Sequence, residues 1–414
     1  MLKPRSKTRD VRTRRRQGGA ALPMVLAGLL AMMAISGLAL DASHALTNKS
    51  RLQATVDAAA LAAAKTFDQT ADLLAANAAA MAIFGMNADG AGNHELDGAF
   101  DAGDISITIQ WSQTLNPFVS VGVGPYVRVI AAGFSIDSSL SVLLGIDAIG
   151  ITSSAVAGPS PTINTACNIA PMVACALDAD DPDLFGFSAG RLEVLKSAAG
   201  TGSPLGPGNF QLVRLNCPGG DCVRENVAGG WEGCISGSET IETEPGNTLG
   251  PTVQGLNTRF GSYSGAMSPD MYPPDVVTTA PFPQLAYDGD ADMVTQNGVE
   301  ATQSTIDYGW ADYQDDIRNA RYTNAPPFGV FERRVLAIPI ARCDGAGAGQ
   351  TTLDVVGFGC YFLLQPVVQK GNEAEIFGQF IQGCTASGAP GPAPVAGADP
   401  YIIQLYKDPG SADS

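Results

Sequence analysis

The sequence is short of the residues that most enzymes and metal sites need. It has two histidines, His44 and His94, and both lie far from the cysteines along the chain. It contains no Cys-x-x-Cys pair, and the glycine-rich stretches at 122–124 and 345–349 lack the lysine and the serine or threonine of a phosphate-binding loop. These absences argue against a zinc site and against a catalytic triad or a Cys–His pair. The sequence therefore predicts no catalytic residue, no cofactor and no metal ion.

Charge is absent from residues 20–40 and unevenly distributed elsewhere. Charged residues make up 16% of the chain, and the net charge is −17. Eight of the 24 basic residues lie within the first 16 positions, where Asp10 is the one acidic residue, so the rest of the chain is strongly acidic. Such a surface repels phosphate, which argues against DNA or RNA as a partner.

The uncharged stretch 20–40 has the length of a membrane span. About 20 residues, rising about 1.5 Å each, cross the roughly 30 Å hydrocarbon core as a helix. Because cations precede the span and few follow it, residues 1–19 are predicted to be a cytoplasmic leader and the bulk of the chain to lie outside the cytoplasm. A cleaved signal peptide is the alternative, but the stretch is longer than a usual signal core and Asp41–Ala45 makes a poor cleavage site. We predict an uncleaved, single-pass anchor.

Cysteine is absent from the first 166 residues and appears eight times after them. An even number of cysteines in an exported domain indicates disulfides formed in an oxidising compartment. Eight cysteines allow 105 connectivities, so the pairing is not derivable. The simplest expectation is local loops, Cys167 with Cys175 and Cys217 with Cys222 or Cys234. The candidates are Cys167, Cys175, Cys217, Cys222, Cys234, Cys343, Cys360 and Cys384.

Glycine and proline are absent from residues 42–84, and alanine fills fourteen of the positions from 54 to 82. This composition predicts a long helix that ends at Gly85, with a break near Asp68, which would cap a second helix. Apolar residues recur at three- and four-residue steps and form one stripe, which continues through Leu74, Ala78 and Met81. The stripe is expected to pack on the sheet of its own domain, against another subunit, or both. The predicted packing face is Leu52, Val56, Ala59, Ala63 and Phe67.

The same segment carries a family resemblance. A Gly-Gly-Ala-Ala lead-in, the apolar span, Asp41 at its exit, Lys49-Ser-Arg-Leu-Gln53 and the alanine-rich stretch 57–64 follow one another. This order resembles the N-terminal module of the TadE/TadG-like proteins that assemble Flp (tight-adherence) pili in bacteria, over about residues 17–67. The resemblance implies an assembly subunit anchored in the bacterial inner membrane, with its bulk periplasmic or extracellular. Its partners would be pilin or other pilus-assembly subunits, bound through the N-terminal helix.

The resemblance also concerns processing. Cleaved pilins carry a glutamate at the fifth position after the cleaved glycine. Here that position is Met24 when counted from Gly19, or Pro23 when counted from Gly18. The missing glutamate argues against cleavage and implies a retained, pseudopilin-like subunit.

Alternating and β-branched runs follow the helix, at 105–111, 126–130 and 149–157. Helix and strands together predict an α+β module over residues 41–158, similar to the pilin plan, with a boundary at 159–161. Residues 162–414 hold all the cysteines and predict a mostly β, disulfide-stabilised ectodomain with a loop-rich stretch near 236–330. The predicted fold class is thus α+β, with a transmembrane helix that continues into an alanine-rich helix packed on an antiparallel sheet. Further strands are expected at 210–215, 334–340, 355–364, 376–381 and 401–406.

Other patterns suggest ion binding. Asp137–Ser141 matches the DxSxS pattern of von Willebrand A metal sites, but it lacks the buried strand and the βα units that such a site requires. The acidic runs 178–183 and 288–292 could collect calcium, although aspartate is also common in turns. Two alternative functions stay open. One is an anchored module that binds sugar, peptide or calcium, and the other is an anchored hydrolase of unrecognised type, which a buried pair of carboxylates in a cleft would support.

Overall fold

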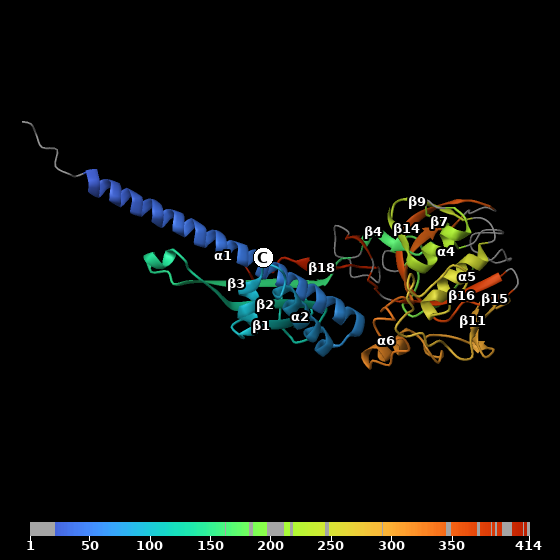
Figure 1. The fold of residues 1–414 in the computed structure, drawn as a ribbon. Coiled ribbons are helices and arrows are strands. Elements are labelled where there is room, and N and C mark those ends of the chain that lie inside the picture. Colours follow the sequence, from blue (N-terminus) through green and yellow to red (C-terminus); the bar gives the residue numbers. More distant parts are fainter. Residues whose placement is uncertain are drawn as a thin grey trace, which may run out of the picture. The chain divides into compact units, whose positions relative to one another are not determined.

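The protein is described by a computed structural model (Figure 1). It divides into two compact units, each built from several segments of the chain. The first unit holds the described residues up to Val56 together with Gly85–Thr108 and Ile130–Ser153; the second holds Asp57–Phe84, Ile109–Val129 and Ser154–Ser414. The structure describes residues 21–161, 163–181, 185–196, 211–215, 218–244, 248–291, 293–344, 349–370, 373–381, 383–385, 387–390, 400–408 and 410–411.

One very long helix begins the described chain, and shorter helices follow it. Their bounds are α1 (Ala21–Thr70), α2 (Leu73–Ala88), α3 (His94–Asp101), η1 (Ser141–Leu144), α4 (Gly220–Gly229), α5 (Leu249–Asn257), η2 (Thr258–Phe260) and α6 (Trp310–Arg318), where η marks a 3₁₀ helix.

The predicted alanine-rich helix is continuous with the apolar span, but its break lies later than predicted. α1 runs without interruption through Asp68 and ends where Ala71 adopts a positive φ of 51°. Asp72 then begins α2, because its carboxylate accepts hydrogen bonds from the backbone N–H groups of Leu74 (2.8 Å) and Ala75 (3.3 Å). The prediction of Asp68 as the cap was wrong because Asp68 bonds distant side chains instead of the next turn.

The end of α2 also differs from the prediction. The helix continues through Gly85 to Ala88. A glycine inside a helix costs only about 1 kcal/mol relative to alanine. A Cβ at Gly85 would lie 3.3 Å from the ring of Phe100, so glycine here allows a close approach between α2 and α3. The break also shifts the phase of the apolar stripe, so that Ala76, Ala80 and Phe84 are buried while Leu74 and Met81 are exposed.

A four-stranded sheet follows, in the order β1-β2-β3-β18. Its first three strands are the ones predicted, β1 (Ser106–Ser112), β2 (Tyr126–Asp137) and β3 (Ala148–Pro159). The fourth strand, β18 (Ile403–Tyr406), comes from the end of the chain and pairs antiparallel with β3, Leu405 opposite Ala157. The last part of the chain therefore completes the sheet that the N-terminal half begins.

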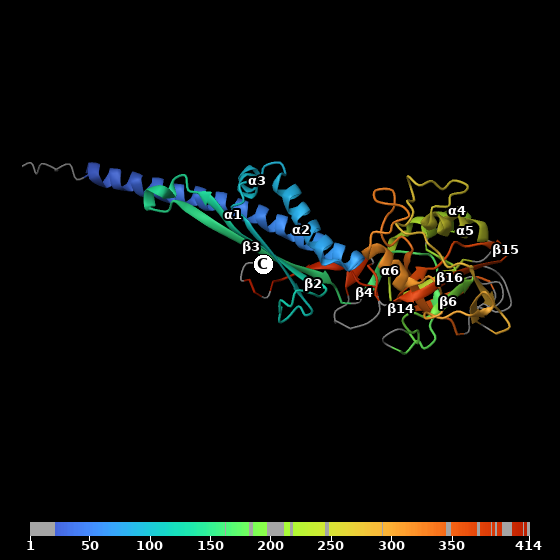
Figure 2. The ribbon, with the colours of Figure 1, turned by 90° about the horizontal axis from the view of Figure 1, so that it is seen from below.

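The connection between β2 and β3 is the turn 138–147, which contains η1. It lies within the first unit, as does the part of α1 before Val56. The turn is closed by a hydrogen bond from the N–H of Ser138 to the carbonyl of Asp147 (2.9 Å). Figure 2 shows this turn beside α1.

The rest of the second unit is mostly β. An eight-stranded sheet has the central order β15-β16-β14-β13-β5, in which β6 also pairs with β16, β9 with β14 and β7 with β9. Two three-stranded sheets have the orders β10-β11-β12 and β17-β4-β8. The bounds are β4 (Ile163–Ile169), β5 (Ala174–Cys175), β6 (Leu192–Lys196), β7 (Val213–Arg214), β8 (Trp231–Ser236), β9 (Thr240–Thr243), β10 (Leu285–Asp288), β11 (Met293–Gln296), β12 (Val299–Glu300), β13 (Val335–Arg342), β14 (Thr352–Leu363), β15 (Gln369–Lys370), β16 (Glu373–Ile381) and β17 (Ser387–Pro390).

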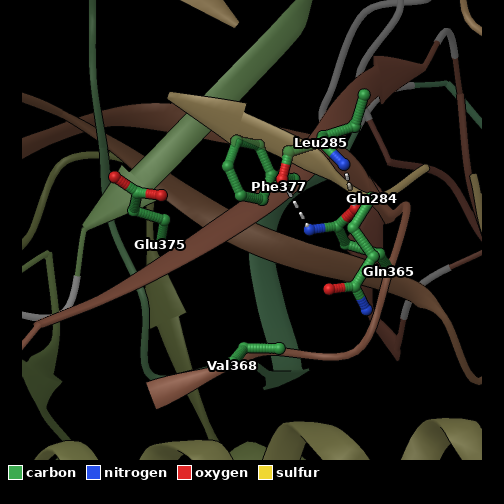
Figure 3. Close-up of a pocket in the computed structure, with 6 residues that line it drawn as sticks. All are labelled: Gln284, Leu285, Gln365, Val368, Glu375 and Phe377. Carbon is green, nitrogen blue, oxygen red and sulfur yellow. Dashed lines mark hydrogen bonds between the residues drawn. The ribbon is translucent and has the colours of Figure 1, made fainter. Parts of the chain in front are cut away.

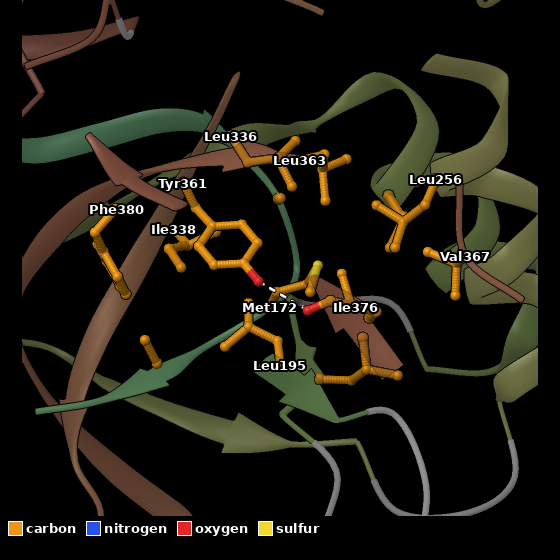
Figure 4. Close-up of a cluster of buried hydrophobic side chains, with 14 of the residues drawn as sticks. Met172, Leu195, Leu256, Leu336, Ile338, Tyr361, Leu363, Val367, Ile376 and Phe380 are labelled. Atoms are coloured by element: carbon orange, nitrogen blue, oxygen red, sulfur yellow. Dashed lines mark hydrogen bonds between the residues drawn. The ribbon is translucent and has the colours of Figure 1, made fainter. Parts of the chain in front are cut away.

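The core of the second unit surrounds β14. This strand pairs antiparallel with β13 along nearly its whole length, and its other partners are β9 and β16. Figure 4 shows the buried cluster on one side of the sheet, where the ring of Tyr361 is enclosed by aliphatic side chains. The Tyr361 hydroxyl donates to the carbonyl of Ile376 (2.8 Å), so its polar end is satisfied inside the core.

A buried arginine joins this sheet to the loops that precede it. The guanidinium of Arg334 donates to the carbonyls of Leu363 (3.0 Å) and Leu364 (2.8 Å) and also to those of Val277 and Thr279. Burial lowers the pKa of Arg334, and the nearby carboxylate of Asp275 opposes that effect. These contacts organise the loop-rich stretch, in which α5, α6 and the β10–β12 sheet form.

The disulfides confirm a disulfide-stabilised, mostly β region, but the expected bonds Cys167–Cys175 and Cys217–Cys234 do not form. Cys167 pairs with Cys234 and not with Cys175, which pairs with Cys343; Cys360 pairs with Cys384. The bonds join neighbouring strands, β4 to β8 and the end of β5 to the residue after β13. Strand pairing, not sequence distance, thus decides which thiols meet. Cys222 is also disulfide-bonded, and Cys217 lies outside the described residues.

Candidate functional site

The first part of α1 exposes an apolar surface. Leu22, Met24 and Ile35 are 76%, 77% and 69% exposed, and the other large apolar side chains before Asp41 are exposed as well. Gly37 is the one buried residue between positions 22 and 40. Among the described residues, α1 is the one helix long and apolar enough to cross a membrane. It is a candidate single-pass anchor.

Asp41 ends this exposed stretch and is buried. Its carboxylate accepts hydrogen bonds from the backbone N–H groups of Ser141 (2.6 Å), Leu140 (2.9 Å) and Ser139 (3.2 Å). The N–H groups of Ser141 and Leu140 lower the pKa of Asp41 to about 2, because they stabilise its charged form. Asp41 therefore attaches the turn between β2 and β3 to the helix.

Side chains on the next turns of α1 contact the start of α3 and the loop before it. His44 Nε2 lies 2.9 Å from Glu95 Oε2, and Asn48 Nδ2 donates to the same oxygen at 2.7 Å. One turn later, the guanidinium of Arg51 donates to the carbonyl of Gly92. Polar side chains of α1 thus position the start of α3, and His44 has a structural partner.

The predicted packing face lies on the next part of α1, and the chain itself covers it. Leu52, Val56, Ala59 and Ala63 are fully buried. Phe67 is half-buried, and its ring centroid lies 4.9 Å from that of Trp111 in β1. Of the two alternatives for this stripe, the intramolecular one is observed.

The family comparison matches this same stretch of the chain. Residues 18–66 match the family model described as Flp pilus-assembly TadE/G-like. The N-terminal module is TadE/G-like. The match covers the exposed apolar span, Asp41 and most of the buried stripe of α1. No curated protein and no solved structure matches the chain.

Just beyond the TadE/G-like module, the end of α1 is bonded to the C-terminal region. Both carboxylate oxygens of Asp68 are engaged, one by the hydroxyl of Thr385 and the other by the hydroxyl of Tyr401. Burial raises the pKa of Asp68, and these hydroxyl groups oppose the rise. Burial, together with the carboxylates of Asp68 and Asp275, raises the pKa of Glu332 to about 8. The chain's own hydroxyls thus occupy both carboxylate oxygens of Asp68.

The DxSxS pattern lies in the turn that is bonded to α1. Its residues, Asp137–Ser141, lie at the end of β2 and in the turn, and its backbone N–H groups bind the carboxylate of Asp41. The turn is therefore occupied by an anion from the protein and lacks the strand-to-helix setting of a von Willebrand A metal site.

The acidic runs 178–183 and 288–292 contain turns in their described parts. Asp288 accepts hydrogen bonds from the backbone N–H groups of Asp290 (3.0 Å) and Ala291 (3.2 Å). Asp180 pairs with Arg342 at 3.1 Å. In the described part of the chain, no three residues of the metal-binding types gather to hold an ion. Asp183 and Asp292 lie outside the described residues.

The loop before β6 carries a further sequence pattern, which was not among those predicted. Gly186-Phe-Ser188-Ala-Gly190 has the spacing of a serine-hydrolase elbow. That elbow requires a strand before the serine and a helix after it, whereas Ser188 is exposed in a loop that leads into β6. The carbonyl of Ser188 accepts a hydrogen bond from the N–H of Arg191 (3.1 Å), so this segment is a turn.

A small hollow on the second unit has little room for a ligand. Figure 3 shows its lining, which includes Gln365, Glu375 and Phe377. Its volume is about 300 Å³ with open solvent included, at the lower limit for small-molecule sites. The amide of Gln365 is bonded to the backbone N–H (2.8 Å) and carbonyl (3.2 Å) of Leu285. Glu375 is the one carboxylate among the described lining residues, so these residues do not supply the acid pair of a glycosidase.

Proposed function

We propose that the chain is a membrane-anchored, pseudopilin-like structural subunit of a Flp/Tad pilus or a related secretion system. One observation carries the proposal. The TadE/G-like match at 18–66 falls on the one described helix that has an exposed apolar span and then a buried, alanine-rich stripe. The same helix can therefore cross a membrane and serve as the backbone of the domain outside it.

The proposed location is the bacterial inner membrane, with the N-terminus in the cytoplasm. The eight basic residues among the first 16 support this orientation, since cationic segments stay on the cytoplasmic side. The disulfides support export of the remaining chain to an oxidising compartment.

The proposed partners are pilin or other pilus-assembly subunits, bound without catalysis. Because the chain itself covers the stripe from Leu52 to Ala63, the partner contact is assigned to the exposed apolar span. A Cβ added at Gly28 would meet nothing within 4 Å, and Ala31, one turn later, is exposed. Small residues on the surface of a membrane helix allow a second helix to approach closely. The acidic surface of the rest of the chain would govern partner choice and association rate more than affinity.

Photo-crosslinking in cells that carry a Flp pilus system tests this proposal. A photoreactive amino acid at Ala31 is expected to form adducts with pilin or another assembly subunit in the inner-membrane fraction. The same amino acid at Leu46, which is 67% exposed but lies after the span, is the matched control. A protein that fractionates as a soluble cytosolic species, or that has fully reduced cysteines in the cell, contradicts the proposal.

A further inference from the structure

The turn between β2 and β3 exposes a cluster of apolar side chains. Leu140, Val142, Leu144 and Ile146 are 44%, 46%, 54% and 39% exposed. Residues 138–146 carry no charge, and Asp137 and Asp147 border them. Exposed apolar residues gathered in one loop are typical of a surface that binds another protein or a membrane.

This turn touches α1 inside its apolar span. A Cβ built on Gly37 would lie 2.6 Å from the Cβ of Leu140, so a side chain at position 37 would clash with the turn. Gly37 lies four residues before Asp41, about 6 Å along the helix axis. Leu140 therefore lies at the level of the last turn of the apolar span.

The backbone of the turn is suited to a medium without water. An unpaired N–H group in hydrocarbon costs several kcal/mol, on the order of 2 to 7. The carboxylate of Asp41 accepts hydrogen bonds from the backbone N–H groups of Ser139, Leu140 and Ser141. Later in the turn, the N–H groups of Gly145 and Ile146 donate to the carbonyls of Val142 (3.0 Å) and Ser141 (3.2 Å). The exposed apolar side chains thus belong to a turn in which these five backbone N–H groups are hydrogen-bonded within the protein.

We propose that this turn is a second membrane contact, which inserts its apolar side chains into the outer edge of the bilayer that α1 crosses. The inference rests on the proposed anchoring of α1. The bilayer is the occupant because the exposed cluster is continuous, through Gly37, with the surface that would face lipid. Asp137 and Asp147 then mark the headgroup level. The contact would hold the sheet close to the membrane surface and fix the angle at which α1 leaves it.

The test uses the purified full-length chain in lipid nanodiscs, with a photoreactive amino acid at one of three positions. Leu144 reports on the turn, and Met33, which is 65% exposed, reports on the span of α1. Val121 is the matched control, because it is an apolar residue with the same 54% exposure as Leu144 but lies before β2. Mass spectrometry after illumination measures lipid adducts at each position.

We expect lipid adducts at Leu144 similar to those at Met33 and in several-fold excess over those at Val121. Lipid adducts at Met33 with only background labelling at Leu144 would overturn the second contact and leave the anchor intact. Protein–protein adducts at Leu144 would overturn it as well, since another copy would then cover the turn. An absence of lipid adducts at Met33 would instead overturn the anchoring on which the inference rests.

Discussion

The carboxylate of Asp41 accepts a hydrogen bond of 2.6 Å from the backbone N–H of Ser141, 100 residues later in the chain. This contact connects the end of the apolar span to the turn between β2 and β3. One acidic side chain thus accepts hydrogen bonds from three successive backbone N–H groups of the turn.

Asp41→Asn should loosen the turn without unfolding the second unit. The amide keeps one acceptor oxygen but loses the charge that strengthens hydrogen bonds to three N–H groups. Hydrogen exchange followed by mass spectrometry should show faster exchange at residues 139–141. Asp101→Asn, at an exposed carboxylate, is the control and should leave these amides unchanged. Unaltered protection in Asp41→Asn would show that the carboxylate contributes little.

The same contact has a defined pH dependence. The pKa of Asp41 is lowered from 3.8 to about 2 in the folded chain, so its stabilising effect is present above pH 3.8. As the pH falls from 3.8 through 2, the folded state must take up a proton and the contribution is lost. Protection at residues 139–141 should therefore decrease in this window for the wild-type chain and not for Asp41→Asn.

Gly37→Ala should disturb the turn more than Gly28→Ala. A Cβ at Gly37 would lie 2.6 Å from the Cβ of Leu140, whereas a Cβ at Gly28 meets nothing within 4 Å. Overpacking of this kind costs about 1 to 3 kcal/mol. The measurement is again exchange at residues 139–141, with Gly28→Ala as the matched control. Adding Leu140→Gly to Gly37→Ala removes the clashing atom and should restore part of the lost protection.

The stability of the second unit should decrease between pH 4.5 and 8 because of Glu332. Its pKa is raised from 4.5 to about 8, so the folded chain holds a proton that the unfolded chain releases. The contribution is complete below pH 4.5 and is lost as the pH rises through 8, by on the order of 2 kcal/mol once the half-burial of the side chain is allowed for.

Thermal unfolding of the full chain across this range measures the effect. Glu332→Gln keeps the shape of the side chain but cannot ionise, so the slope of Tm against pH should flatten. Glu239→Gln, at an exposed site, serves as the control and should retain the wild-type slope. An equal slope in wild type and Glu332→Gln would mean that Glu332 does not titrate in this window.

Local sequence patterns predicted much of the fold, and the order of the N-terminal motifs predicted the family module. The absence of glycine and proline after Asp41 predicted a helix, and β-branched alternation predicted β1, β2 and β3. The α+β class and the mostly β second region are both observed. The helices α4 and α5 were missed because glycine and proline reduce their intrinsic propensity; α5 contains Gly250 and Pro251. Burial of Val227 and Leu256 in one core stabilises them instead, which is tertiary information.

The site could be predicted only in part. Asp41 stood out in the sequence as the charge that closes the apolar span, but nothing local indicated that residues 139–141 would bind it. Likewise, Asp68 had the sequence of a helix cap, whereas Thr385 and Tyr401 determine its role. Contacts between residues so distant in sequence depend on strand register and chain path, which local patterns do not encode.

The disulfide pairing makes a final prediction about relative stabilities. In the chain-entropy model, a crosslink stabilises more when it closes a longer loop. Cys175–Cys343 closes 168 residues and Cys360–Cys384 closes 24, which correspond to about 5 and about 3.5 kcal/mol. Replacing both cysteines of the first pair by alanine should therefore lower the free energy of unfolding by about 1.5 kcal/mol more than replacing the second pair. Urea unfolding of the two double variants, each compared with its single Cys→Ala variants, measures the difference, and a larger loss from the short loop would contradict the entropic account for this protein.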